Sequence, residues 1–240
     1  MKNRVIFLTS IIVICSLSFC LMMNSTNTDI LYFGIPYGNY VELYIINLSI
    51  YACYCFLCFS RTDNFLIEYG LFLVVRNKSR KKILAKYLLT LLRDILLLEI
   101  VKIIAFVMVQ YIVFHDASGN LINLLYDALV YVIVICIMVL LQVNIEIFIN
   151  APVALLVNIC SYLLFSFLGS YIYSQCIETN QKMGVFLNSF FLTNYIMNVR
   201  VNGFTEWLHY SRIVIGLILA VILIGMYLFS LRIFSKKDLI

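Results

Sequence analysis

The feature of this chain that most restricts its fold is a series of six long apolar runs. Each is close to the length of about 20 residues that a helix needs to cross a hydrocarbon core about 30 Å thick. Of the 240 residues, 64% are hydrophobic and 12% are charged, which leaves too little polar surface to cover a water-soluble domain. The runs lack the short alternating pattern of membrane β-strands. They predict transmembrane helices at residues 5–23, 41–59, 95–114, 125–149, 152–173 and 213–234.

The distribution of lysine and arginine predicts the orientation, because positively charged loops stay in the cytoplasm. Lys2 and Arg4 precede the first run, and Arg232, Lys236 and Lys237 close the chain. Eight more lie between the second and third runs, namely Arg61, Arg76, Lys78, Arg80, Lys81, Lys82, Lys86 and Arg93. The segments after the first, third and fifth runs carry Lys182, Arg200 and Arg212. We therefore predict one all-α, polytopic membrane domain with both termini in the cytoplasm.

Cysteine and histidine show no convincing metal or redox pattern. Seven of the eight cysteines lie inside predicted spans, where cysteine behaves as a small hydrophobic residue. Cys55 and Cys58 have the spacing of redox and zinc motifs, but packing is the favoured interpretation. The sequence has no GxxxxGK[ST], HExxH or GxSxG motif, so we expect neither a metal site nor an enzyme that binds its own nucleotide.

Four ionisable residues lie within or near the ends of predicted spans, where a buried charge is costly and marks a candidate functional position. They are Glu99, Lys102, Asp127 and Glu146. Glu99 and Lys102 stand three residues apart on one helix face and can neutralise each other. Two interpretations remain open for them, an internal ion pair or a position on a substrate pathway. Asp127 and Glu146 lie near opposite ends of the fourth span, and we expect them to reach the interface.

The loop at 60–93, between the second and third runs, is the longest cytoplasmic segment. Its first half, DNFLIEYGLFLVV, is mostly apolar but too short to cross a bilayer, so we expect it to lie on the membrane surface or dock on a partner. The basic stretch RNKSRKKILAKY follows, and Ser79 suits the N-cap of a helix that continues into the third run. Its cations would hold the loop inside and contact anionic lipid headgroups. Because those roles leave the apolar half unexplained, the loop also favours a docking function.

Within this loop an acidic residue is followed by a glycine, an apolar stretch, a Ser-Arg pair and a lysine that enters the third run. These positions are Glu68, Gly70, Arg76, Ser79, Arg80 and Lys86. Their order resembles the first cytoplasmic loop of type-2, exporter-class ABC transporter permeases, and the tail FSKKDL is similar to that family's usual ending. The chain departs from the family pattern at Leu71, Lys78 and Ala85, where threonine, proline and glycine are common.

The resemblance covers essentially the whole chain and implies a permease subunit. Two such subunits, identical or paired with a sister permease, would form the pathway, and separate ATPase subunits would bind ATP and Mg below it. The chain itself would then hold no cofactor and would bind no nucleic acid. The coupling element would extend over 64–86 and dock on the ATPase through Glu68, Gly70, Arg76, Ser79, Arg80, Lys81, Lys82 and Lys86.

The outer loop at 175–211 contains apolar residues at three- and four-residue spacing, which predicts a one-sided apolar helix. They are Leu187, Phe190, Phe191 and Tyr195. The resembled family carries a short re-entrant helical hairpin at this place, and the same is implied here. An ordinary amphipathic surface helix is the open alternative.

The uniformly apolar spans and small loops suit an amphipathic or lipid-like cargo better than a sugar or an ion. Small permeases of the resembled class often export antimicrobial peptides or bacteriocins, or protect the producer from them, and the composition is that of an AT-rich bacterial genome. We therefore expect a multi-pass protein of a bacterial cytoplasmic membrane that exports a peptide or confers immunity. The alternatives are an ion-coupled transporter, for which Glu99, Asp127 or Glu146 would be essential, and an intramembrane enzyme.

Overall fold

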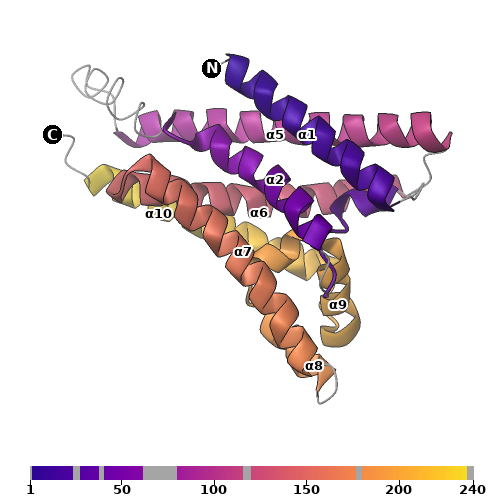
Figure 1. The fold of residues 1–240 in the computed structure, drawn as a ribbon. Coiled ribbons are helices and arrows are strands. Elements are labelled where there is room, and N and C mark those ends of the chain that lie inside the picture. The colour runs from indigo at the N-terminus through magenta and orange to yellow at the C-terminus, as the bar shows by residue number, and fades with distance from the viewer. Residues whose placement is uncertain are drawn as a thin grey trace.

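The computed structural model describes residues 2–23, 28–37, 41–61, 80–115, 120–176 and 180–236. Within these ranges the chain forms helices joined by turns and short extended pieces, with no β-strand (Figure 1). Six of the helices are long: α1 (Lys2–Met23), α2 (Val41–Cys58), α5 (Arg80–Phe114), α6 (Leu121–Phe148), α7 (Ala151–Cys176) and α10 (Arg212–Lys236). Each contains a stretch long and apolar enough to cross a membrane. The all-helical class and the six spans are confirmed, and the chain is a multi-pass membrane protein.

The helix α5 is much longer than the span expected within it. It has 35 residues, which corresponds to about 50 Å of helix, so it extends well beyond a hydrocarbon core about 30 Å thick. It begins at Arg80, and the second half of the loop expected at 60–93 is therefore part of this helix. The basic residues at its start lie on a rigid extension of a membrane span.

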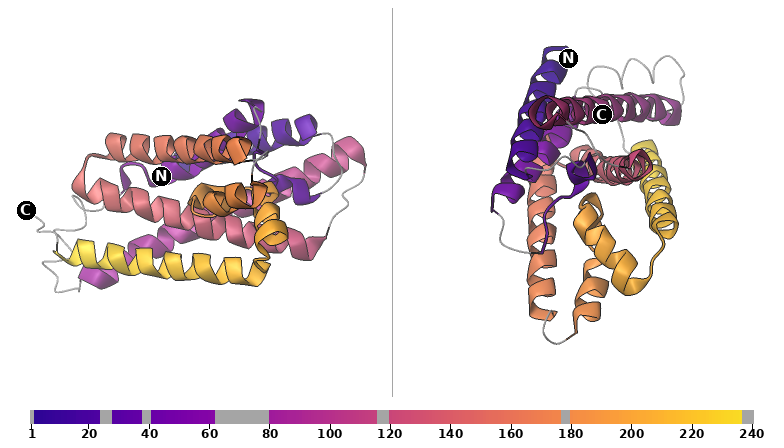
Figure 2. Two further views of the ribbon diagram at one scale, coloured as in Figure 1. Left: turned by 90° about the horizontal axis from the view of Figure 1, so that it is seen from below. Right: turned by 90° about the vertical axis from the view of Figure 1, so that its right-hand side faces the viewer.

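The helix α6 forms the centre of the bundle. In its span 67% of the residues are buried, compared with 17% in α10, and it packs against α2, α5, α7 and α10. Figure 2 shows α10 at an edge of the bundle, where most of its apolar surface faces outward. The helix α1 packs on α2 and α5 at the opposite side.

The first helix begins and the last helix ends on the same side of the bundle, on the left in Figure 1, where α5 also begins. This arrangement follows from an even number of spans. The assignment of this side to the cytoplasm stays a prediction from the positive residues. We refer to it below as the basic end.

The opposite end carries four short elements: η1 (Thr28–Tyr32), α8 (Gln181–Asn188), η3 (Leu192–Ile196) and α9 (Asn198–Leu208). The helix α8 folds back along α7, and the two meet where Gly184 approaches the Cys176 side chain so closely that a Cβ there would lie 2.7 Å from Cys176 Cβ. The elements form a helical hairpin. Its entry into the outer leaflet stays a prediction.

The single apolar helix expected through Leu187 and Tyr195 is wrong, because α8 ends at Asn188. A buried pair of asparagines turns the chain there. The side chain of Asn188 donates to Gly184 O at 2.9 Å, and Asn194 Nδ2 donates to Asn188 O at 2.8 Å. The residues named for that face consequently separate: Phe190 is exposed in the turn that follows α8, while Phe191 stacks on Phe165 of α7.

Candidate functional site

The polar centre of the bundle is an ion pair on α5. Glu99 and Lys102 stand one helical turn apart and are 3% and 1% exposed, and Lys102 Nζ lies 2.7 Å from Glu99 Oε1. Two charges this deep are stable in a folded bundle only when they are paired and when their remaining hydrogen-bonding groups have partners.

Tyrosines from three other elements complete the surroundings of the pair. Tyr32 of η1 and Tyr54 of α2 donate their hydroxyls to the two oxygens of Glu99, the latter at 2.5 Å. The Lys102 ammonium lies 3.5 Å from the ring centroid of Tyr131 on α6 and 4.5 Å from that of Tyr32, which are cation–π distances. We call these five residues the central cluster. These contacts join α5 to η1, α2 and α6.

A second group of polar side chains links α2, α6 and α7 within the same buried interior. Asn158 accepts from the Tyr51 hydroxyl at 3.0 Å and donates to Gln142 Oε1 at 3.1 Å and to Cys55 Sγ at 3.3 Å. Gln142 Nε2 in turn donates to Cys55 O and to Glu146 Oε1. These contacts hold three membrane helices in register.

Asp127 and Glu146, which we expected to reach the interface near the ends of their span, have buried side chains. They are 7% and 2% exposed and are buried against other parts of the protein. Asp127 accepts from Asn198 Nδ2 at 2.7 Å, which attaches α9 to α6. Glu146 lies one turn from Gln142 and belongs to the group around Asn158.

A buried arginine joins the elements at the end opposite the basic end. Arg200 of α9 is fully buried. Its guanidinium donates to four uncharged oxygen atoms, which are Ile35 O, Ser166 O, Asn194 Oδ1 and Ser170 Oγ. The ring of Tyr37 covers its guanidinium at 4.9 Å. Burial lowers the pKa of Arg200 from its usual value, but arginine's intrinsic pKa is so high that the group stays charged. This arginine cluster joins three parts of the chain: the segment that precedes α2, the helix α7 and the outer hairpin.

Gly169 makes this arginine cluster possible. A Cβ at that position would lie 2.7 Å from Asn188 Oδ1 and 2.8 Å from an Arg200 Nη atom. Only a residue without a side chain lets α7 approach these polar atoms. The sequence offers no periodicity that marks the position, since Gly169 stands within an apolar run like any other small residue.

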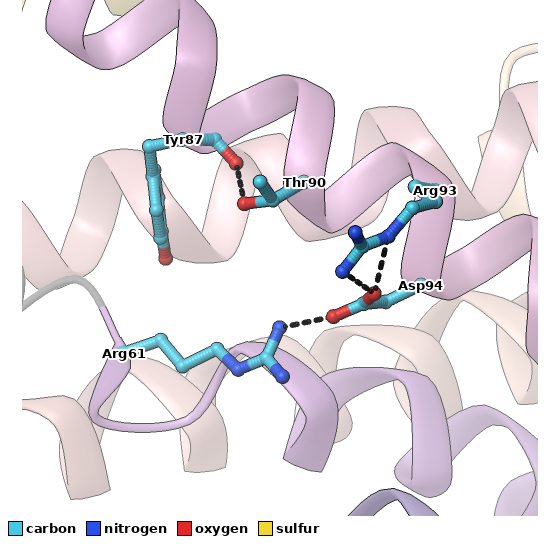
Figure 3. A network of polar contacts seen from close by, with 5 residues as sticks. All are labelled: Arg61, Tyr87, Thr90, Arg93 and Asp94. Atoms are coloured by element: carbon cyan, nitrogen blue, oxygen red, sulfur yellow. Dashed lines mark hydrogen bonds and ion pairs between the residues drawn. The ribbon is translucent and has the colours of Figure 1, made fainter. Parts of the chain in front are cut away.

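A fourth polar site lies at the basic end, where the chain leaves α2 and enters α5 (Figure 3). Ser60 adopts a left-handed conformation with φ of 57° and ends the helical path, which directs Arg61 toward α5. Arg61 Nη1 donates to Asp94 Oδ2 at 2.8 Å, and their side chains are 11% and 7% exposed. Asp94 Oδ1 also accepts from Arg93 Nη2 at 2.9 Å, although Arg93 is 66% exposed. We call the Arg61–Asp94 ion pair the root clamp, because it joins the two helices from which residues 62–79 extend.

The comparisons with known proteins give one result. A family model described as a protein of unknown function, DUF2705, matches residues 4–240. The chain belongs to this family. No curated protein and no solved structure matches it.

The coupling residues expected in this DUF2705 member divide into two groups. Glu68, Gly70, Arg76 and Ser79 lie outside the described residues. Arg80 and Lys81 form the first turn of α5, followed by Lys82 and Lys86, both of which have exposed side chains. Lys82 and Lys86 belong to neither the central cluster nor the root clamp.

Sequence reasoning identified the charges of the central cluster but not their partners. Tyr32, Tyr54 and Tyr131 come from separate elements, and the sequence has 17 tyrosines among which these three are unmarked. The amides of Gln142 and Asn158 were a usable signal, because a buried amide in a membrane helix needs a partner on another helix. In the part of the chain that the structure describes, no group of three or more His, Cys, Asp or Glu side chains could hold a metal ion.

Proposed function

We propose that this DUF2705 member is the transmembrane permease subunit of an ABC exporter, driven by a separate ATPase and moving an amphipathic peptide or lipid-like substrate. The observation that carries the proposal is the root clamp. Six spans alone suit many transporters, but a subunit that is driven from outside needs its cytoplasmic segment to be fixed to the spans that must move.

The root clamp meets that mechanical need. Segment 62–79 leaves α2 and returns to α5, and the buried Arg61–Asp94 pair joins these two helices at the point of departure. A displacement of the segment would therefore move α2 and α5 together rather than bend the segment alone. The central cluster repeats the connection deeper in the bundle, since Tyr54 of α2 donates to Glu99 of α5.

The charge at the start of α5 supports docking of a soluble partner. Lys82 and Lys86 are exposed on a helix that extends beyond the span expected at 95–114. Exposed cations on a rigid support can orient an acidic surface of a partner, and the apolar segment before them can supply buried area. ATP and Mg would be bound by that partner, and closing of its nucleotide sites would tilt the permease helices as rigid bodies.

A second candidate function is an ion-coupled transporter, and the central cluster favours it because buried ionisable residues often mark ion pathways. Two features of the cluster weigh against this function. The Glu99 carboxylate is already neutralised by Lys102 at 2.7 Å, and both of its oxygens accept tyrosine hydroxyls. A group that takes up and releases a proton or cation during transport needs an open partner position, and this one is filled by the protein itself.

Transport by inside-out membrane vesicles separates the two functions. We expect substrate uptake that requires ATP and persists when an uncoupler removes the proton gradient. The Glu99→Gln/Lys102→Met double variant should keep ATP-driven uptake, because it removes the whole buried pair. Uptake that follows the proton gradient without ATP, and that this double variant abolishes, would replace the permease proposal by the ion-coupled one.

A further inference from the structure

A groove on the side of the bundle is distinct from the four polar sites. It has a volume of about 330 Å³ and lies between α5, α6 and α10. Its lining is apolar except for a thiol and one tyrosine hydroxyl, and it includes Ala85, Leu88, Leu92, Val139, Leu223 and Ile224. Leu89 and Ile224 at its edges are 64% and 58% exposed, so the groove opens to the surroundings of the protein. An exposed apolar face is ordinary in a membrane protein, but a concave one is a candidate site.

The position and the lining of the groove select its occupant. The groove lies between three membrane-spanning helices, and its walls are almost wholly apolar. The hydrocarbon chains of the surrounding bilayer reach such a groove directly, so it suits an acyl chain of a lipid.

The charges beside the groove select the headgroup. On α5 the groove begins at Ala85. Lys82 lies three residues before Ala85 and seven before Leu89, so the three residues share one face of the helix. Lys82 is about 10 Å from Leu89 along the helix axis, toward the basic end. Lys86 adds a second exposed cation in the same turn as Ala85. The nearest described acid along α5 is Asp94, and Arg61 and Arg93 already neutralise it.

We propose that this groove binds an anionic phospholipid of the leaflet at the basic end. One acyl chain lies between α5, α6 and α10, and the phosphate contacts Lys82 and Lys86. The inference rests on the groove and the neighbouring cations and does not need the permease proposal, although it gives Lys82 and Lys86 a lipid phosphate as a partner in addition to the ATPase surface proposed above.

The test uses vesicles that contain phosphatidylglycerol and phosphatidylcholine with identical acyl chains. The full-length protein is reconstituted, extracted gently and weighed by native mass spectrometry, and the retained lipids are counted by headgroup. We expect wild-type protein to retain phosphatidylglycerol in preference to phosphatidylcholine. A lysine near a membrane surface raises the preference for anionic lipid about fivefold, so the double variant Lys82→Gln/Lys86→Gln should lower the ratio of retained phosphatidylglycerol to phosphatidylcholine by about 25-fold. Lys182 is an exposed lysine at the opposite end of the bundle, and Lys182→Gln should leave the ratio of retained lipids unchanged.

A second variant tests the groove itself. Ala85→Phe places a ring in the space for the acyl chain and should remove the retained lipid. The matched control is Gly225→Phe on α10, where an added Cβ meets nothing within 4 Å, and it should retain lipid as the wild type does. Equal retention of the two lipids by the wild type, or full retention by Ala85→Phe, would overturn the proposal. A lipid-free dimer that Ala85→Phe dissociates would also overturn it and would assign this face to a second copy. If Ala85→Phe fails to fold, the exposed lysine variants still decide the question.

Discussion

Replacing Lys102 with methionine should strongly destabilise the folded bundle, because Glu99 would keep a charge in a position that is 3% exposed. The change removes an ion pair of 2.7 Å and two cation–π contacts. Loss of one partner of a buried ion pair typically costs about 3–5 kcal/mol. Glu99 would keep the hydroxyls of Tyr32 and Tyr54, so we expect a loss near the lower limit, about 3 kcal/mol.

The double variant Glu99→Gln/Lys102→Met should recover most of this loss. It leaves no buried charge, and the glutamine oxygen still accepts from a tyrosine. Replacement of a whole buried pair by neutral side chains of similar size is often close to neutral, so we expect a free energy of unfolding within about 1 kcal/mol of the wild type. The interaction energy from the double-mutant cycle should then be about 3 kcal/mol or more.

The free energy of unfolding can be measured by titrating purified protein from mild detergent into SDS. Arg93→Met is a suitable control, because this arginine is 66% exposed and an exposed ion pair contributes at most about 1 kcal/mol. If the double variant loses as much stability as the two single variants together, the charges are not energetically coupled and the reasoning about the central cluster is refuted.

Two further variants test the other polar sites. Asp94→Asn should lower the free energy of unfolding by about 3 kcal/mol, since it leaves the buried Arg61 guanidinium without a carboxylate, and ATP-driven transport should fall more than the amount of folded protein does. Gly169→Ala should lower the free energy of unfolding by about 1–3 kcal/mol, because its Cβ would crowd Arg200. Gly216→Ala on α10, where a Cβ meets nothing within 4 Å, should raise it by about 0.5–1 kcal/mol. Equal effects of the two changes in the same SDS titration would contradict the role given to Gly169.

The spans could be predicted from the sequence because hydropathy over about 20 residues reports a requirement of the bilayer itself. The beginning of α5 could also be predicted, because Ser79 suits an N-cap and the helix begins at the next residue, Arg80. Likewise, the three-residue spacing of Glu99 and Lys102 placed them on one helix face, and the structure joins them at 2.7 Å. Local contacts of this kind depend on helix geometry alone.

Contacts between distant segments could not be predicted in this way. Arg200 was recognised only as a cation of the outer loop, yet its four acceptors come from three separate parts of the chain. The break after Asn188 was missed for a different reason: the apolar spacing continues through Tyr195, but a hydrogen bond from the Asn194 side chain to Asn188 O accompanies the end of the helix, and apolar spacing does not report such a bond. A single sequence carries no record of such pairings.

The most direct test of the permease proposal is to purify the tagged protein from its native membrane in mild detergent and to identify by mass spectrometry what remains bound. The account predicts an ATPase subunit in near-equal amount, lost when Arg80, Lys81 and Lys82 are replaced by glutamine and retained when Lys182, at the opposite end, is replaced in the same way. Recovery of the protein alone, in a preparation without nucleotide-dependent activity, would contradict the proposal.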